Sequence, residues 1–411
     1  MQGMMLIKRF HLIHDFYSKN KLSICIVFVI LTVSTFFMVQ ILSEIGYYTY
    51  TKDQFTESDT KNSIYYMPSQ NNTQENPTAT NEVKNDILLQ HFSALQDVIL
   101  PASVGVGVGS LENFGYAQAC DEAYVDCFQF VDEGRWFSEE EPASGRAEII
   151  ISGVLLQNLK IGDEIDIYFG QKDGVDIKVA AVVVGKKNEP AYFPTFGYKS
   201  VEVGTQNIFE QGHSLVFIRA ENIPAWWVEP QYASNMLVRF KENSSLAKRQ
   251  QVLDYLSEIG SYITYDELIA NSDKFILNMF NRRLPLPIFM LIISTFSFIS
   301  VTALAVNSKL KDYRVYFLCG CSRKKCMASI FSAVGLVGLL SGLVNTLYVF
   351  LYPFLLRNGY MRYITDSDMA MEKDMILYII FYILLCIGLS LLIPLSRISR
   401  RTLIQIYGEK P

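Results

Sequence analysis

Charged residues are scarce in this chain, and acidic residues outnumber basic ones. Only 19% of its 411 residues are charged, and 41 Asp and Glu against 36 Lys and Arg give a net charge of −5. Nucleic-acid binding needs a basic surface to neutralise phosphates, so no nucleic acid is expected as a partner. Half of the residues are hydrophobic. This balance is typical of a chain divided between apolar membrane spans and an ordinary folded domain.

Patterns that mark enzymes and metal sites are also missing. The sequence has no G-x-x-x-x-G-K-[ST] nucleotide loop, no H-E-x-x-H and no G-x-S-x-G. The Gly-rich run GVGVG at 105–109 has no Lys, which favours a strand over a phosphate-binding loop. Cys319, Cys321 and Cys326 have no His close enough to complete a zinc site. We therefore expect no catalytic residue, no metal and no cofactor bound by this chain.

Four apolar runs are long enough to cross a membrane. They cover 22–45, 284–306, 327–356 and 375–395, and a span needs about 20 apolar residues. The first run is longer than a signal-peptide core, and no small-x-small cleavage site follows it closely. We expect it to remain as an anchor. The sequence thus predicts an α-helical integral membrane protein with four transmembrane helices.

The distribution of Lys and Arg predicts the orientation. Basic residues dominate 1–21, 307–326 and 396–411, whereas 357–374 carries mixed charge. The positive-inside rule then places both termini and the 307–326 loop in the cytoplasm, and 357–374 outside. Residues 1–21 have apolar side chains at nearly helical spacing, which fits an amphipathic helix on the inner surface; an unstructured basic tail fits equally well.

Residues 46–283 are expected to form an extracytoplasmic α+β domain between the first two spans. The polar stretch 51–85 predicts a linker. Helices are predicted over 86–98 and 245–259, and a helical stalk over 265–283 leads into the second span. Strand-like runs lie at 104–108, 148–151, 164–169, 177–184, 214–219 and 236–240.

Four segments of this domain resemble the periplasmic core domain of MacB-like permeases. They read EGRWFS at 133–138, AEIIIS at 147–152, LKIGDEI at 159–165 and VVVG at 182–185. A fifth segment, DYRVYFLCGCSRKK at 312–325, resembles the cytoplasmic segment between the second and third spans of FtsX-like permeases. It departs from that pattern at Arg314 and Phe317.

The resemblance implies the permease subunit of an ABC transporter in the plasma membrane of a prokaryote. Such a subunit is not an enzyme and works with a separate cytoplasmic ATPase, which uses ATP and Mg. It pairs with a second permease, identical or different, and contacts membrane lipid. The expected role is export of a peptide, antibiotic or lipid-type substrate, or force transmission across the membrane. The alternative is a receptor or scaffold whose outer domain binds a ligand or protein partner.

Three groups of residues are candidate sites. The first is a predicted helix that couples the permease to the ATPase. Its apolar side chains recur at helical spacing, with an acidic residue beside them and a capping glycine after them. The alternative is a basic loop that only sets the membrane topology. These residues are Leu310, Asp312, Tyr313, Phe317, Leu318 and Gly320. Gly335, Gly338 and Gly342 form a small-residue face for helix packing, within the subunit or against a partner. Cys120 and Cys127 form a disulfide or remain as thiols.

Overall fold

The computed structural model describes most of the chain. The backbone is described at residues 21–68, 91–100, 103–129, 131–138, 145–153, 158–172, 174–187, 192–194, 202–211, 215–224, 235–318, 323–357 and 375–400, together with 89 and 156. The chain divides into two compact units. The helical unit comprises Met1–Glu44, Phe280–Leu355 and Met371–Pro411, and the mixed unit comprises Ile45–Met279 and Leu356–Ala370.

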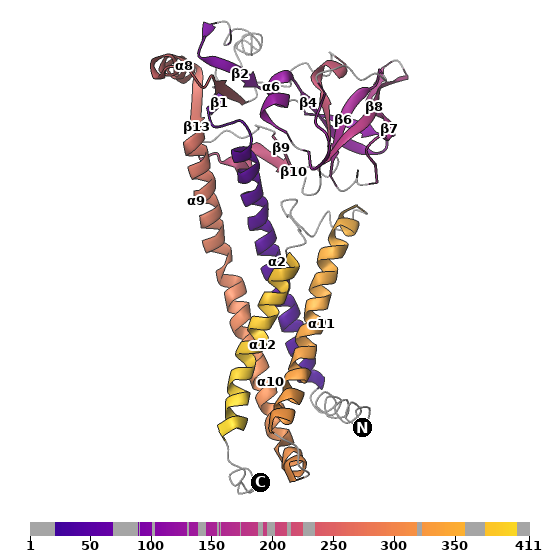
Figure 1. Cartoon of the computed structure of the whole chain (residues 1–411), viewed down its shortest axis with the longest axis vertical. Helices are drawn as coiled ribbons and strands as arrows, with labels where there is room; N and C mark the ends of the chain where they lie inside the picture. The colour runs from indigo at the N-terminus through magenta and orange to yellow at the C-terminus, as the bar shows by residue number, and fades with distance from the viewer. Residues whose placement is uncertain are drawn as a thin grey trace. The chain divides into compact units, whose positions relative to one another are not determined.

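In the described part of the chain, the helical unit is built from long helices, which Figure 1 shows as coiled ribbons. They are α2 (Lys21–Glu57), whose last residues belong to the mixed unit, α10 (Pro285–Leu318), α11 (Arg323–Arg357) and α12 (Met375–Arg400). Within the described residues, three helical stretches are long and apolar enough to span a membrane: Lys21–Glu57, Tyr265–Val301 and Val334–Tyr352. The shorter apolar stretch Met375–Leu389 lies in α12. The fourth span therefore stays a prediction.

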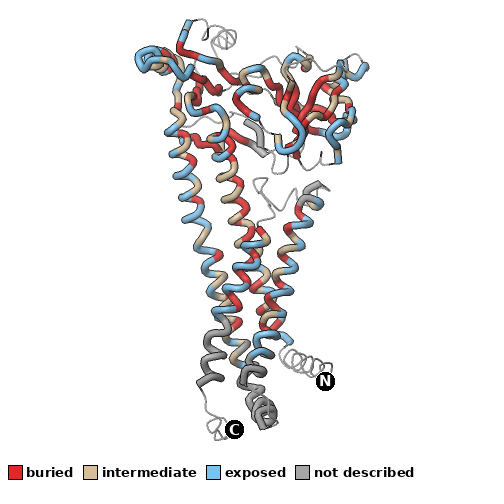
Figure 2. Tube along the Cα trace, viewed as in Figure 1, coloured by how far each residue is buried: buried red, intermediate tan, exposed pale blue. Residues whose placement is uncertain are grey.

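Apolar side chains lie both inside and outside this helical unit. Leu31, Val337 and Ile379 are buried between the helices, whereas Phe296 and Phe350 are more than half exposed. Figure 2 shows exposed and buried segments alternating along these helices. Helices that are apolar on their outer faces too are suited to a lipid surrounding.

The mixed unit contains a four-stranded antiparallel sheet in the order β13-β1-β12-β2. Its strands are β1 (Ser63–Pro68), β2 (Leu95–Ile99), β12 (Met236–Phe240) and β13 (Gly260–Thr264). Helix α8 (Leu246–Ile259) connects β12 to β13, and its Val252 and Leu256 pack on one face of the sheet. In chain order the strands lie 4-1-3-2, which is the split β-α-β arrangement of ferredoxin-like sheets.

Two predicted elements of this region are wrong. The 51–85 linker is helical to Glu57 and then forms β1, and residues 95–98 of the predicted 86–98 helix belong to β2. All six residues of β1 are buried, so the strand lacks the alternation that identifies a half-exposed strand. The stretch before β2 has apolar residues at helical spacing, which masks the strand. Residues 69–88 lie outside the described part of the chain.

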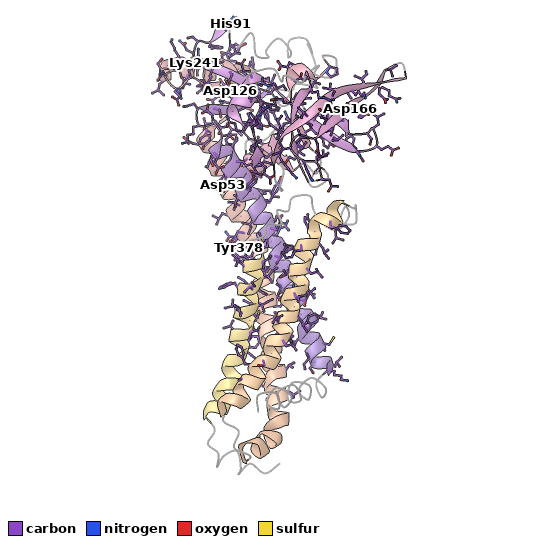
Figure 3. The ribbon with its side chains drawn as sticks, turned by 45° about the vertical axis from the view of Figure 1, so that its right-hand side comes forward. Asp53, His91, Asp126, Asp166, Lys241 and Tyr378 are labelled. Atoms are coloured by element: carbon purple, nitrogen blue, oxygen red, sulfur yellow. The ribbon has the colours of Figure 1, made fainter. Side chains whose placement is uncertain are left out.

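A closed barrel is inserted between β2 and β12. Its strands are β3 (Ser103–Val108), β4 (Phe114–Cys120), β6 (Ala147–Ser152), β7 (Glu164–Lys172), β8 (Val175–Lys187) and β11 (Leu215–Arg219), and the short strand β5 (Glu133–Gly134) pairs with the end of β8. They pair in the order β5-β8-β6-β11-β4-β3-β7, and a further β8–β7 pairing closes the sheet. The interior is filled by β-branched and small residues, among them Val106, Ile149, Ile167 and Val183. Figure 3 shows Asp166 on this barrel and Lys241 beside the four-stranded sheet.

The remaining elements surround a core shared by the sheet and the barrel. They are α6 (Glu122–Cys127), β9 (Tyr192–Pro194), α7 (Thr205–Ile208), β10 (Phe209–Gln211), η2 (Ala220–Asn222) and α9 (Tyr265–Arg283). This core combines Tyr65 of the sheet, Phe217 of the barrel and Phe55 of α2. Helix α9 covers the residues predicted as the stalk, and α8 begins after Ser245, as expected.

Candidate functional site

The motifs that resemble MacB-like domains meet at one side of the barrel, around the buried carboxylate of Glu148. Arg135, just after β5, forms a two-pronged ion pair with Glu148 on β6. The backbone N–H of Ser138 donates to the same carboxylate at 2.9 Å. Burial raises the pKa of Glu148, but the bonds from Arg135 and Ser138 outweigh it, so the net pKa is lowered. Glu148 is therefore an ionised structural anchor.

The aromatic residues of the first motif are held by neighbouring strands and helices. Arg219 of β11 donates to the carbonyl of Ser138 at 2.7 Å and lies 5.6 Å from the centre of the Phe137 ring. The indole N–H of Trp136 donates to the carbonyl of Val125, in α6, at 3.2 Å. These bonds attach the segment after β5 to both the barrel and α6.

Two glycines allow β5 and β8 to approach closely. Gly134 pairs with Gly185, and a Cβ on Gly185 would lie 2.5 Å from the carbonyl oxygen of Arg135. Gly134 has φ +82°, and a Cβ there would lie 2.4 Å from the carbonyl oxygen of Val184. The glycine of VVVG and the glycine of EGRWFS are thus required by the same backbone contact.

The LKIGDEI segment forms a turn that docks on β8. The Lys160 N–H donates to the Asp163 carboxylate at 2.8 Å, and Gly162 adopts φ +93°. Gly162 donates to the carbonyl of Val183 at 2.8 Å, and the Val183 N–H donates to the carbonyl of Asp163 at 3.0 Å. Since all four motifs contact one another through β8, their role is to build this side of the barrel.

A buried arginine, which the sequence does not single out, joins its strand to two other elements. Arg239 of β12 is 2% exposed and forms an ion pair with Asp97 on β2. It also binds the carboxylate of Asp59, after α2, at 2.8 Å. A buried charge persists only when it is paired and hydrogen-bonded. The group therefore fixes the end of α2 against the sheet.

A second buried cation links the barrel to α2. Lys187, the last residue of β8, is 8% exposed and lies 3.2 Å from the Asp132 carboxylate and 5.5 Å from the centre of the Tyr50 ring. Burial lowers the pKa of Lys187, but Tyr50 and Asp132 raise it by more, so Lys187 remains positively charged. Its charge is thus stabilised on both sides, by an ion pair and by a ring face.

Helices α2 and α9 lie side by side in the mixed unit. Lys52 Nζ lies 2.6 Å from the Asp273 carboxylate, and the rings of Tyr48 and Phe275 make an edge contact with centroids 5.0 Å apart. The Phe55 ring stacks on Tyr265 at 5.8 Å. Asp53 marks this part of α2 in Figure 3. These contacts at successive turns hold α2 and α9 together, and we call the two helices a braced pair.

The predicted cysteine and glycine sites have the following surroundings. Cys120 and Cys127 are buried free thiols in the structure, and the choice between a disulfide and two thiols in the protein stays a prediction. Burial raises the pKa of Cys127 to about 12, so it is a poor nucleophile. A Cβ on Gly338 would meet Ile387 and Ile383, and one on Gly342 would meet Ile383, all within the helical unit. A Cβ on Gly335 would meet no atom within 4 Å.

The predicted coupling loop is largely helical. Residues 307–318 continue α10 and α11 starts at Arg323, so the described part of the predicted coupling helix is the end of α10. Leu310, Asp312, Tyr313, Phe317 and Leu318 lie on this continuation; their side chains, and Gly320, are outside what the structure describes. The predicted second span ends at residue 306, where charged residues begin. Helix α10 continues because backbone hydrogen bonding does not stop at the end of the apolar run.

No group of three or more His, Cys, Asp or Glu side chains that could hold a metal occurs in the described residues. The arrangement just described is structural in character: ion pairs fix neighbouring strands and the end of α2, a glycine contact brings β5 and β8 together, and α2 pairs with α9. These features, with helices long and apolar enough to span a membrane, fit a membrane protein of the permease type.

Comparison with known proteins gives the family. The model of the MacB-like periplasmic core domain matches residues 22–254, and the chain belongs to this family. Its class is accordingly that of an ABC transporter permease-type component. No curated relative matches the chain at a significant level.

Three solved structures are similar to parts of this chain. The extracellular domain of the noncanonic ABC-type transporter YknZ from Gram-positive bacteria is 17% identical (48% of this chain, 94% of that chain, TM-score 0.29). The periplasmic region of MacB from Actinobacillus actinomycetemcomitans is 9% identical (54% and 94%, TM-score 0.30). A domain of a putative permease protein from Porphyromonas gingivalis is 8% identical (51% and 93%, TM-score 0.29).

Proposed function

We propose that this chain is the permease subunit of an ABC transporter in which a separate ATPase drives movement of the mixed unit through α2 and α9. The observation that carries the proposal is the bracing of these two helices by Lys52–Asp273 and Tyr48–Phe275. Helix α2 is unbroken from Lys21 to Glu57. A braced pair of continuous helices transmits displacement, whereas a flexible linker absorbs it.

In this proposal the mixed unit is extracytoplasmic and both termini are cytoplasmic, in the plasma membrane of a prokaryote. The end of α10, with Asp312 and Phe317, docks on the ATPase, which binds ATP and Mg. A second permease, identical or different, completes the assembly. The substrate is a peptide, antibiotic or lipid-type molecule, or the work done is mechanical force on an outer partner. The barrel contains buried ion pairs and no reactive cluster in its described part, which suits both substrate export and force transmission.

The alternative is a membrane receptor or scaffold whose outer domain binds a ligand or a protein. The braced helices would serve a receptor equally well, since they would carry a signal inward. The two functions differ in the partner that they require.

The experiment is co-purification from native membranes. A tagged full-length chain, extracted in mild detergent, is expected to bring down a cytoplasmic protein with a nucleotide-binding G-x-x-x-x-G-K-[ST] loop. Asp312→Ala and Phe317→Ala should lower its recovery several-fold, while Ser332→Ala, an exposed position on α11 that bonds only its own helix, should not. If no ATPase is recovered even after crosslinking, the receptor function becomes the better account. Unchanged recovery with Asp312→Ala and Phe317→Ala removes the docking role of α10.

A further inference from the structure

Helices α2 and α11 are joined inside the helical unit by hydrogen bonds rather than by apolar contacts alone. Asn345 is 2% exposed, and its amide N–H groups donate to the carbonyls of Thr32 at 3.3 Å and Ser341 at 3.0 Å. The Thr32 hydroxyl also lies 3.2 Å from that of Ser341. One asparagine therefore connects the backbone of α2 to α11 within an apolar stretch.

The two helices run in the same direction along this contact. One turn after Thr32, the ring of Phe36 packs on Tyr348 with centroids 4.9 Å apart. Residue numbers thus rise together on both sides, from Thr32 and Ser341 to Phe36 and Tyr348. A buried asparagine in a parallel helix pair is a known way to specify one register, because other registers leave its amide without partners.

Apolar contacts alone would fix this register weakly. Lipid tails are as apolar as leucine, so sliding one apolar helix along another changes little burial. The contact of α11 with α12 is different, since the side chains of Ile383 and Ile387 fill the space at Gly338 and Gly342. Complementary shape fixes the register of α11 against α12, whereas the register of α2 against α11 depends on Asn345.

We infer that Asn345 is a positioning residue that fixes the register of α2 against α11. Ser341 and Asn345 lie one helical turn apart, and Thr32 contacts both. Without the amide, α2 gains access to registers shifted by one turn, or about 5.4 Å. This inference does not rest on the proposed transport function, because it concerns the packing of the helical unit alone.

The test is site-specific crosslinking in native membranes. In a full-length chain whose seven native cysteines are replaced by alanine, Phe36→Cys is combined with Tyr348→Cys to report the observed register. Phe36→Cys with Val344→Cys, and Phe36→Cys with Tyr352→Cys, report registers one turn away. Each pair is treated with the same short bifunctional thiol reagent, with and without Asn345→Leu. Gly342→Cys with Ile383→Cys reports the α11–α12 contact.

Asn345→Leu is expected to lower the Phe36–Tyr348 crosslink at least two-fold and to raise one of the shifted crosslinks, with the α11–α12 crosslink unchanged. Ser332→Ala, on the same helix but bonded only to the carbonyl of Ala328, should change none of them. Two results would overturn the inference. One is an unchanged ratio of the α2–α11 crosslinks; the other is an equal loss at the α11–α12 pair, which means general unfolding.

Discussion

At the scale of single residues, the mixed unit depends on charges that have been removed from water. Arg239, Glu148 and Lys187 are each less than 10% exposed, and each has a partner of opposite charge. Desolvating an ion costs several kcal/mol, which its partner offsets only in the correct geometry. Each pair therefore makes one arrangement of neighbouring elements much more stable than others.

Replacing Arg239 by methionine is expected to lower the stability of the folded chain by about 3 kcal/mol, because the Asp97 carboxylate, which is only 17% exposed, would lose its partner. The matched control is Arg146→Met, which removes a solvent-exposed pair with Glu164 and should cost less than about 1 kcal/mol. Thermal unfolding of the purified full-length variants in detergent measures both. Equal losses would show that burial of Arg239 contributes nothing.

Glu148 predicts a dependence of stability on pH. Its folded pKa is lowered, so its contribution is present above the pKa of the unfolded chain and is lost as the pH falls through the folded value. Glu148→Gln should be less stable than the natural chain at neutral pH, and the difference should shrink below about pH 4. Unfolding midpoints measured from pH 7 to pH 3 check this. A constant difference over the whole range would contradict the role of the ionised carboxylate.

At the scale of secondary-structure elements, the β5–β8 contact predicts which glycine is indispensable. Gly134→Ala places a Cβ 2.4 Å from the carbonyl oxygen of Val184 and also keeps a left-handed backbone. Gly162→Ala has the left-handed backbone without any atom within 4 Å, so it should cost only about 1 kcal/mol. Gly134→Ala should cost clearly more, by thermal unfolding of the full chain. The same loss for both variants would mean that the close approach of β5 and β8 is unimportant.

The strands that sequence could predict are those marked locally, either by alternation of buried and less buried residues or by turn residues at their ends. β8 and β3 follow this alternation, and β12 is bounded by turn residues, so all three were predictable. β1 and β2 were not, because their strand character appears only when β12 and β13 supply long-range pairing. Tertiary pairing thus overrides local pattern in this sheet.

The candidate site was predictable to a similar extent. The family motifs could be recognised, but their physical reason could not: the pairing of Arg135 with Glu148 and of Gly134 with Gly185 needs β5, β6 and β8 in place. Arg239 and Asn345 gave one signal each, a lone charge in an apolar strand and a lone amide in an apolar helix. Neither signal says which partner it meets.

At the scale of the whole molecule, the predicted orientation can be tested by thiol labelling. Leu246, at the start of α8, is 85% exposed. In a cysteine-free chain, Leu246→Cys should react with a membrane-impermeant maleimide in intact spheroplasts. A cysteine placed in the 396–411 tail should react only after the membrane is opened. Reaction of both without lysis, or of the tail alone, would reverse the predicted topology.

The insertion of the barrel within the four-stranded sheet sets an order of folding. All the barrel strands lie between Ser103 and Arg219, so the barrel can close as soon as that stretch has been synthesised. The sheet must bring β1 at Ser63 together with β13 at Thr264, and its central strand β1 has no partner until β12 emerges. Such long-range pairing is slow because a large loop must close first. During synthesis β1 therefore stays unpaired until β12 has been made. A barrel that has already folded shortens the loop that must close when β1 pairs with β12.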